Sequence, residues 1–165
     1  MAVASRGWLG VLLDLVFPPR CAGCRRRGIW LCGPCVAALT RLGPPLCRYC
    51  GRPTGGVQTC PDCWRHRPAL DGVHSPYLFE GPLRLLIHRF KYRHAAHLAA
   101  PLAALLSAGD AVFLRPAEAI VPVPLHPRRL RQRGYNQAAL LAAALAPRLG
   151  LPVVEGCLQR VRDTP

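Results

Sequence analysis

The sequence predicts an α/β chain in two parts: a cysteine-rich N-terminal module, followed by helices that flank a short parallel sheet. The first part is indicated by eight of the nine cysteines, which form four Cys-x-x-Cys pairs within the first 63 residues. The second part is indicated by a change of composition after residue 70. There, segments 119–124, 137–149 and 151–154 are predicted as strand, helix and strand, the order of a parallel βαβ unit.

Residues 1–19 are predicted to form a short amphipathic helix that packs on the cysteine-rich module. Trp8–Phe17 is apolar, but it is short, Asp14 interrupts it and no small-residue cleavage site follows. No stretch of the chain reaches the roughly 18 uninterrupted apolar residues that a membrane span needs. We therefore expect no membrane span and a cytoplasmic location.

Residues 20–66 are predicted to form two zinc sites of four cysteines each. Two cysteines three positions apart place both sulfurs on one metal from a single tight turn, and two such turns complete a tetrahedral shell of thiolates. The regular spacing beside Gly and Pro favours zinc over four disulfides or an iron–sulfur cluster. The predicted metal ligands are Cys21, Cys24, Cys32, Cys35, Cys47, Cys50, Cys60 and Cys63.

The sequence leaves open which cysteine pairs bind the same zinc ion. Serial pairing gives one zinc to the first two cysteine pairs and one to the last two. It is favoured because segments 20–41 and 46–66 repeat the same knuckle, short ribbon and knuckle. A cross-braced arrangement, in which alternate pairs share a metal, fits the spacing almost as well. The ninth cysteine, Cys157, lies in an apolar strand-like stretch and is expected to be a buried thiol.

The stretch after the cysteines is predicted to contain an edge strand and two helices. Val73–Phe79 can form a strand, which Pro76 restricts to a sheet edge. Pro82 suits the first turn of a helix, where its missing N–H has no partner to lose. A second helix is expected over Ala95–Ser107. The first of these helices has an apolar stripe at helical spacing, formed by Leu83, Leu86, Ile87 and Phe90.

A basic loop is predicted between Pro124 and Asn136, where a strand ends and a helix begins. Open α/β sheets bind ligands at this place, and the free N–H groups of the helix attract anions. The guanidinium groups of arginine match phosphate oxygens bidentately. We therefore predict a phosphate or diphosphate site, with a solvated loop or a nucleic-acid contact as the alternatives. Its arginines are Arg128, Arg129, Arg131 and Arg133.

The formal net charge of the 165 residues is +14. Eight thiolates and two zinc ions would together lower this charge by four, to about +10. A charge of this sign favours phosphate-rich partners such as nucleic acid, nucleotides or anionic lipid, while a solvated basic surface is the alternative. The sequence contains no Ser-His-Asp order, paired carboxylates or Gly-Lys-Ser loop, so we predict no catalytic residue.

These motifs resemble those of the ComF/GntX family, in the same order along essentially the whole chain. The matching segments are PPRCAGC, WLCGPC, CRYCG, CPDCW, LIHRFKYR, VPVPLHPRRLRQRGYNQ and LQRVRDTP. The resemblance implies a double zinc ribbon over 20–66 and a type I phosphoribosyltransferase-like domain after it. It also implies a function in DNA uptake during natural transformation, with single-stranded DNA and the DNA-uptake machinery as partners. By the match, Gly134 and Asn136 join the four arginines near the diphosphate of phosphoribosyl pyrophosphate (PRPP).

One motif that the resemblance leads us to expect is missing from this sequence. Phosphoribosyltransferases carry two adjacent aspartates followed by a Thr-Thr-Gly loop, and this chain has neither. We therefore expect residues 67–165 to be a partial domain without the PRPP loop, in a fragment that does not transfer a phosphoribosyl group as written. One alternative is a phosphoribosyltransferase whose catalytic loop, binding PRPP with magnesium, lies in missing sequence. Another is a zinc-dependent interaction or nucleic-acid-binding module. In it, aromatic rings near Arg or Lys either stack on nucleobases or pack the zinc core, Trp30 and Trp64 especially. These rings are Trp30, Tyr49, Trp64, Phe90, Tyr92 and Tyr135.

Overall fold

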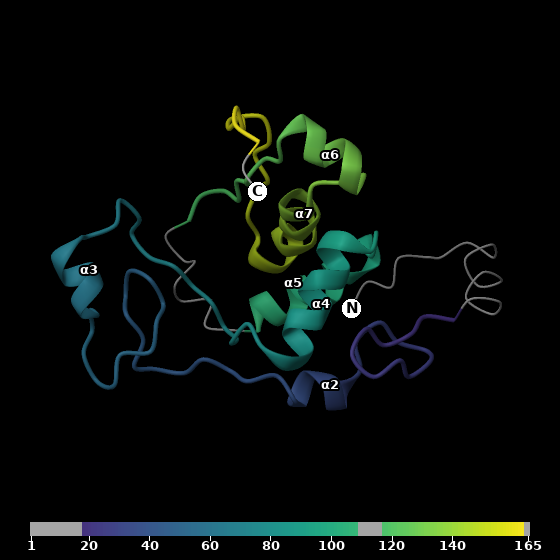
Figure 1. Cartoon of the computed structure of the whole chain (residues 1–165), viewed down its shortest axis with the longest axis horizontal. Coiled ribbons are helices and arrows are strands. Elements are labelled where there is room, and N and C mark those ends of the chain that lie inside the picture. The colour runs from purple at the N-terminus through teal and green to yellow at the C-terminus, as the bar shows by residue number, and fades with distance from the viewer. Residues whose placement is uncertain (1–17, 109–116, 164–165) are drawn as a thin grey trace.

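A computed structural model of the chain describes residues 18–108 and 117–163 (Figure 1). The helix predicted over 1–19 therefore lies outside the described residues, apart from its last two positions. Two short helices belong to the cysteine-rich module, and the others form the C-terminal part. The helices are α2 (Gly33–Ala37), α3 (Pro61–Arg65), α4 (Gly81–Tyr92), the 3-10 turn η1 (Ala96–Leu98), α5 (Ala99–Ser107), α6 (Pro127–Arg133) and α7 (Gln137–Leu149).

The predicted helix at Pro82 is confirmed as α4. Pro82 lies in its first turn, and the helix ends where His94 takes a left-handed conformation with φ 49°. Leu86 and Phe90 are 0% and 2% exposed and Leu83 is also buried, while Ile87, the fourth residue of the apolar stripe, is partly buried. The stripe belongs to the same buried cluster as Leu102 and Leu105 of α5, and α5 lies against α7 (Figure 1).

The helix predicted over 137–149 is also confirmed, as α7. Asn136 caps it, because its side-chain oxygen accepts a hydrogen bond of 3.0 Å from the N–H of Ala138. Gly150 ends the helix in the left-handed conformation that glycine adopts most easily.

The prediction of a loop after Pro124 is wrong, because residues 127–133 form helix α6. Pro127 occupies the first helical position, the ring of His126 accepts a hydrogen bond from the N–H of Arg128, and Gly134 ends the helix with φ 77°. Arginine, leucine and glutamine are good helix formers, and these start and stop residues are sufficient for a short helix. The arginines are therefore distributed around a helix rather than along an extended loop.

The parallel sheet is not confirmed. Within the described ranges, β-structure is limited to isolated bridges, of which Ile120 with Val153 is the parallel one. Ile120 donates to the carbonyl of Pro152 and accepts from the N–H of Val154, at 2.8 and 3.0 Å. The next residue on this edge is Pro122, which has no N–H to continue the ladder.

The segment predicted as an edge strand over 73–79 likewise forms a single bridge. Tyr77 pairs with Arg41 in an antiparallel arrangement, flanked by hydrogen bonds from Leu42 to Pro76 and from Leu78 to Thr40. The chain therefore leaves the body of the protein at Arg41 and returns to it at Tyr77.

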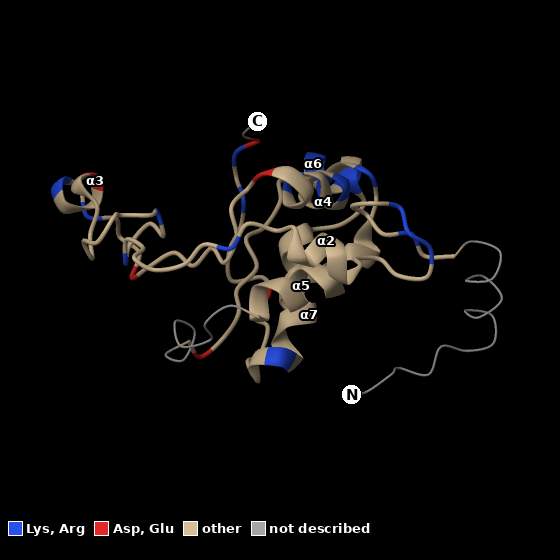
Figure 2. Cartoon of the chain, turned by 90° about the horizontal axis from the view of Figure 1, so that it is seen from below, with Lys and Arg blue, Asp and Glu red and all other residues tan. Residues whose placement is uncertain are grey.

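The main hydrophobic core includes the first half of the cysteine-rich module. Cys21, Leu31 and Leu39 are buried together with α4 and α5, and Arg89 of α4 donates a hydrogen bond to the carbonyl of Ala22. The second half, which includes α3, lies apart at one end of the molecule (Figures 1 and 2). None of the helices in the described part of the chain combines the length and apolarity that a membrane crossing needs.

Candidate metal centres and basic pocket

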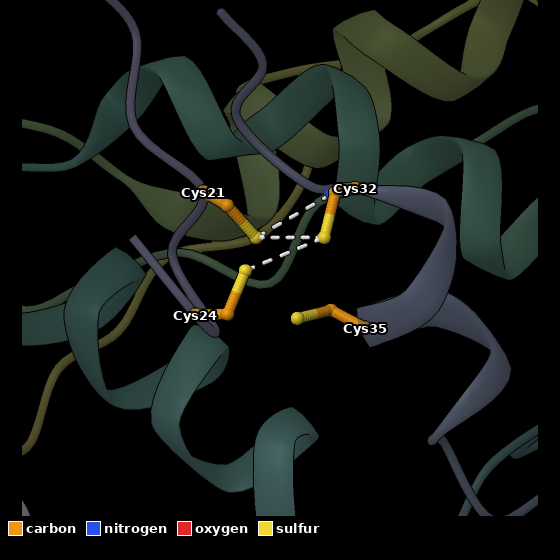
Figure 3. A group of neighbouring side chains, drawn as sticks. All are labelled: Cys21, Cys24, Cys32 and Cys35. Atoms are coloured by element: carbon orange, nitrogen blue, oxygen red, sulfur yellow. Dashed lines mark hydrogen bonds between the residues drawn. The ribbon is translucent and has the colours of Figure 1, made fainter. Parts of the chain in front are cut away.

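Four cysteine sulfurs converge at the first candidate metal centre (Figure 3). Those of Cys21, Cys24, Cys32 and Cys35 all lie within 4.8 Å of one another, and the Cys21 to Cys32 and Cys24 to Cys32 distances are both 3.5 Å. Tetrahedral zinc with Zn–S bonds of about 2.3 Å holds its sulfurs about 3.8 Å apart. The four thiols are thus close to the spacing that zinc requires.

The backbone around this centre is built to carry negative charge. Burial alone would raise the pKa of the Cys21 thiol, but hydrogen bonds from the N–H groups of Cys32, Cys24 and Gly23 lower it to about 6. Burial and the neighbouring sulfurs raise the pKa of Cys35 to about 12. Four thiolates cannot coexist at these distances without a cation, so the donor set fits a divalent, thiophilic metal such as zinc.

The second candidate centre repeats this geometry with Cys47, Cys50, Cys60 and Cys63, whose sulfurs also lie within 4.8 Å of one another. The N–H of Cys60 donates to the sulfur of Cys47 at 3.4 Å, as that of Cys32 does to Cys21. Hydrogen bonds from the backbone of Cys60 and Cys50 lower the pKa of Cys47 to about 6, and burial raises that of Cys63 to about 12.

The two groups consist of the first two and the last two pairs, so the structure has the serial arrangement that the repeat favoured. When bound, each zinc would supply a structural cross-link between the two knuckles of its ribbon. Two such centres on a repeated unit define the class of protein: a double zinc ribbon protein.

A basic pocket of about 190 Å³ is lined by residues from the end of α4 and from α6. The described side chains that line it include three cations and no acidic residue. Arg133 is held in place there, because its guanidinium lies 4.9 Å from the ring centre of Tyr92 and donates to Gln137 at 3.2 Å. The lining consists of Lys91, Tyr92, His94, Arg129, Gln132 and Arg133.

Helix α6 brings only part of the predicted phosphate site together. Arg129 and Arg133, four residues apart, both line the basic pocket, whereas Arg128 and Arg131 do not. Arg128 lies 3.7 Å from Asp163, and Arg131 is exposed.

The other two predicted residues shape the backbone instead. Gly134 ends α6, and a Cβ at this position would lie 4.0 Å from the ring nitrogen Nδ1 of His94. The side chain of Asn136 is used locally, since it caps α7 and donates to the carbonyl of Val123 at 3.2 Å.

Sequence reasoning missed Lys91, Tyr92, His94 and Gln132 as pocket residues. Lys91 and Tyr92 could have been found from the sequence, because they belong to the LIHRFKYR segment that resembles the ComF/GntX family. Their proximity to α6 depends on packing: the hydroxyl of Tyr135 donates to the carbonyl of Phe90, which ties the end of α4 to the turn before α7.

A larger and mainly apolar cavity of about 440 Å³ adjoins the basic pocket. It lies between α4, α5 and α7, and Lys91 and Arg133 line both cavities. Gln137 faces it and is 6% exposed, with no hydrogen-bond partner for its amide nitrogen among the described residues.

Exposure also tests what the sequence predicted for Cys157, Trp30 and Trp64. Cys157 is exposed, so the expectation of a buried thiol is wrong. Trp30 is partly buried against the core, and its ring centre lies 3.8 Å from that of His97, as expected of a packing residue. Trp64 is 82% exposed, so it does not pack on the second zinc centre.

Comparison with known proteins supports the class and gives the family. Residues 12–64 match the double zinc ribbon domain. The chain is 33% identical to competence protein F of Haemophilus influenzae over 88% of its own length and 67% of that protein. It is 35% identical to DNA utilization protein YhgH of Salmonella typhi, with 81% of this chain and 61% of the relative covered. The corresponding values for competence protein ComFC of Bacillus subtilis are 31%, 70% and 51%.

The chain therefore belongs to the ComF family of competence and DNA utilization proteins. It spans between about half and two thirds of the length of these three relatives. The comparison with solved structures finds no significant match.

Proposed function

We propose that this protein acts in DNA uptake by binding single-stranded DNA, or a PRPP-type ligand, through phosphate groups held in the basic pocket. The observation that carries the proposal is the convergence of Lys91, Arg129 and Arg133 on one small cavity, whose lining among the described residues includes no acidic side chain. The names of the relatives supply the biological setting, since they are a competence protein and DNA utilization proteins.

The pocket suits phosphate for physical reasons. The planar fork of Arg133 is preorganised by its contacts with Tyr92 and Gln137, so little side-chain entropy is lost when it binds an anion. Lys91 adds a compact point charge from the neighbouring helix. The ring of Tyr92 is 56% exposed at the same place and offers a surface on which a base can stack.

The zinc ions have a structural function in this proposal. The first centre lies in the same core as α4, which carries Lys91 and Tyr92 into the pocket. The proposal includes a cytoplasmic location, where thiolate ligands stay reduced, and contact with the DNA-uptake machinery.

The test uses the zinc-loaded chain and a fluorescently labelled oligo(dT). We expect binding that weakens steeply with salt, because displaced counterions dominate the affinity for a polyanion. Inorganic diphosphate and PRPP should compete for the pocket. Arg133→Gln and Lys91→Gln should each weaken binding, whereas Arg148→Gln, an exposed change at the far end of α7, should not.

Two results would exclude the pocket. One is affinity that does not change with salt. The other is equal binding by the Arg133→Gln, Lys91→Gln and Arg148→Gln variants, which would move the phosphate contacts elsewhere on the protein.

A further inference from the structure

The two zinc ribbons can be aligned residue by residue through their hydrogen bonds. In the first, the N–H of Ala22 donates to the carbonyl of Trp30 at 2.9 Å; in the second, Arg48 donates to Gln58 at 3.0 Å. Each donor follows the first cysteine of its ribbon, and each acceptor precedes the third by two positions. The alignment extends into the short helices.

At the helix of each ribbon, the residue after the fourth cysteine donates its N–H to the carbonyl of the third. These bonds join Val36 to Cys32 and Trp64 to Cys60, and both measure 3.0 Å. Val36 and Trp64 therefore occupy equivalent places on equivalent backbones, and their surroundings can be compared directly.

In the first ribbon this face is covered by the protein itself. Leu31 and Leu39 are buried, and Trp30 and Val36 pack against the main hydrophobic core. The face is the apolar surface by which the first ribbon docks onto α4 and its neighbours.

In the second ribbon the equivalent face is open and has a different chemistry. In the alignment, Thr59 and Arg67 of the second ribbon correspond to Leu31 and Leu39 of the first. Trp64 corresponds to Val36 and is 82% exposed. The buried cluster of this ribbon consists of cysteines, with Tyr49 packed against them. An apolar docking face has thus been replaced by one large exposed ring among polar and basic side chains.

Three arginines belong to the same ribbon as Trp64, and two of them flank the ring of Tyr49, which packs on the cysteines. Arg48 and Arg67 place their guanidinium carbons 5.2 and 5.1 Å from the ring centre of Tyr49, and Arg65 follows Trp64 in the sequence. Within the described part of the chain none of these three arginines forms an ion pair. The nearby carboxylate of Asp62 is held by Arg52 at 2.7 Å. A zinc bound by four thiolates carries a charge of −2, so attraction depends on these local arginines rather than on the net charge of the ribbon.

We propose that this surface, here called the ribbon tip, binds single-stranded nucleic acid. A base stacks on Trp64 while the arginines hold the adjacent phosphates. The ribbon tip consists of Arg48, Tyr49, Trp64, Arg65 and Arg67. Charge complementarity favours a polyanion, and the loss of the leucines found in the first ribbon disfavours an apolar protein face as the occupant. The inference rests on the proposed function, because it gives the protein a second contact with the same DNA strand.

The test measures oligo(dT) binding by the zinc-loaded full chain. Trp64→Ala should weaken binding roughly five- to hundredfold, the range typical of losing one stacked base. Trp64→Phe should keep most of the affinity, because a ring remains. Phe79→Ala, which removes another exposed aromatic side chain outside the ribbon, is the matched control and should bind normally.

Three further measurements sharpen the test. Oligo(dT) should quench tryptophan fluorescence in the wild type and much less in Trp64→Phe. Arg67→Gln should lower the salt slope by about 0.7, the value for one phosphate contact on a single strand. Zinc content should stay unchanged in all variants, since the altered side chains are exposed.

The possible failures differ. One outcome is that Trp64→Ala binds oligo(dT) as well as Phe79→Ala does, while Arg133→Gln binds it more weakly. The ribbon tip is then not a DNA surface, and a protein becomes the partner to test there. The proposal for the basic pocket stands in that case. If the wild type binds no oligo(dT) at all, the ribbon tip and DNA binding by the basic pocket both fall, and the pocket stands as a ligand site only if inorganic diphosphate or PRPP binds it.

Discussion

The guanidinium of Arg129 donates a hydrogen bond from Nε to the carboxylate of Asp163 at 2.9 Å. This contact joins two segments that lie 34 residues apart in the chain, helix α6 and the end of the described C-terminal segment. Arg128 lies within 3.7 Å of the same carboxylate. Asp163 therefore neutralises part of the charge that α6 brings to the basic pocket, and it competes with any anion that Arg129 could bind.

Replacing Asp163 by Asn should increase the affinity of the basic pocket for phosphate. The side chain keeps its size but loses its charge, so Arg129 is released toward the ligand. We expect inorganic diphosphate to bind roughly two- to fivefold more tightly, as is usual for the loss of one solvent-exposed ion pair. Isothermal calorimetry on the zinc-loaded protein would measure the change. An unchanged or weaker affinity would contradict the competition.

The contribution of the Arg129 to Asp163 contact to stability should depend on pH. The hydrogen bond from Arg129 lowers the pKa of Asp163 below its usual value of 3.8. A lowered carboxyl pKa means that the contact stabilises the fold above that usual value and is lost as the pH falls through the lowered one. The difference in stability between the wild type and Asp163→Asn should therefore be largest at neutral pH and vanish in strong acid. Urea unfolding at several pH values would measure it.

Loss of the two zinc centres should have unequal consequences. Cys32→Ser removes a ligand that lies in the main core, so both zinc binding at that centre and the packing of α4 should suffer. Cys60→Ser should cost the second zinc and leave the helical part intact, because its cluster contains only the second ribbon. Each variant should retain about one zinc per chain, against about two in the wild type. Far-ultraviolet circular dichroism during heating would separate them, and equal melting curves would contradict the unequal roles.

Among the described residues, Phe90 is the largest side chain with almost no exposure, at 2%, and its truncation should be costly. We expect Phe90→Ala to reduce the free energy of unfolding by about 3–5 kcal/mol, the usual result of emptying a buried aromatic site. Phe79→Ala changes a side chain that is 62% exposed and should cost less than about 0.5 kcal/mol. Equilibrium unfolding in urea compares the two.

Gly51 should tolerate no side chain. It has φ 70°, and a Cβ there would lie 2.9 Å from the carbonyl oxygen of Val73. Gly51→Ala should therefore weaken zinc binding at the second centre more than Gly55→Ala. Gly55 has a similar φ of 64° but open space around it, so its variant suffers only the backbone cost of about 1–2 kcal/mol. Competition with a chromogenic chelator would measure both affinities, and equal losses would show that Val73 is irrelevant.

The two clusters of four cysteines could be predicted from the sequence because their geometry is local. A Cys-x-x-Cys turn directs two sulfurs to one point wherever it occurs, and the repeat of the unit favoured the pairing that the structure shows. Helix α7 was equally predictable, since Asn136 and Gly150 mark its two ends.

The basic pocket was harder to predict because its geometry is not local. Several arginines in succession suggested an extended loop, yet Pro127 and Gly134 bound a helix that turns Arg128 and Arg131 away. Lys91 and Arg133 come to line one cavity only in the folded chain, where Arg133 of α6 lies against the ring of Tyr92 at the end of α4. The sheet was overestimated for a different reason: β-branched residues predicted a strand, but Pro122 removes the N–H on which its ladder depends.

The pairing of Arg41 with Tyr77 has a consequence for engineering. Because the polypeptide enters and leaves the second ribbon through adjacent, mutually bonded positions, everything between them is an insertion whose two ends already meet. A tight β-turn spliced across that junction should yield a shortened protein with one zinc that still folds. The excised ribbon should be transplantable into any exposed hairpin that offers the same spacing.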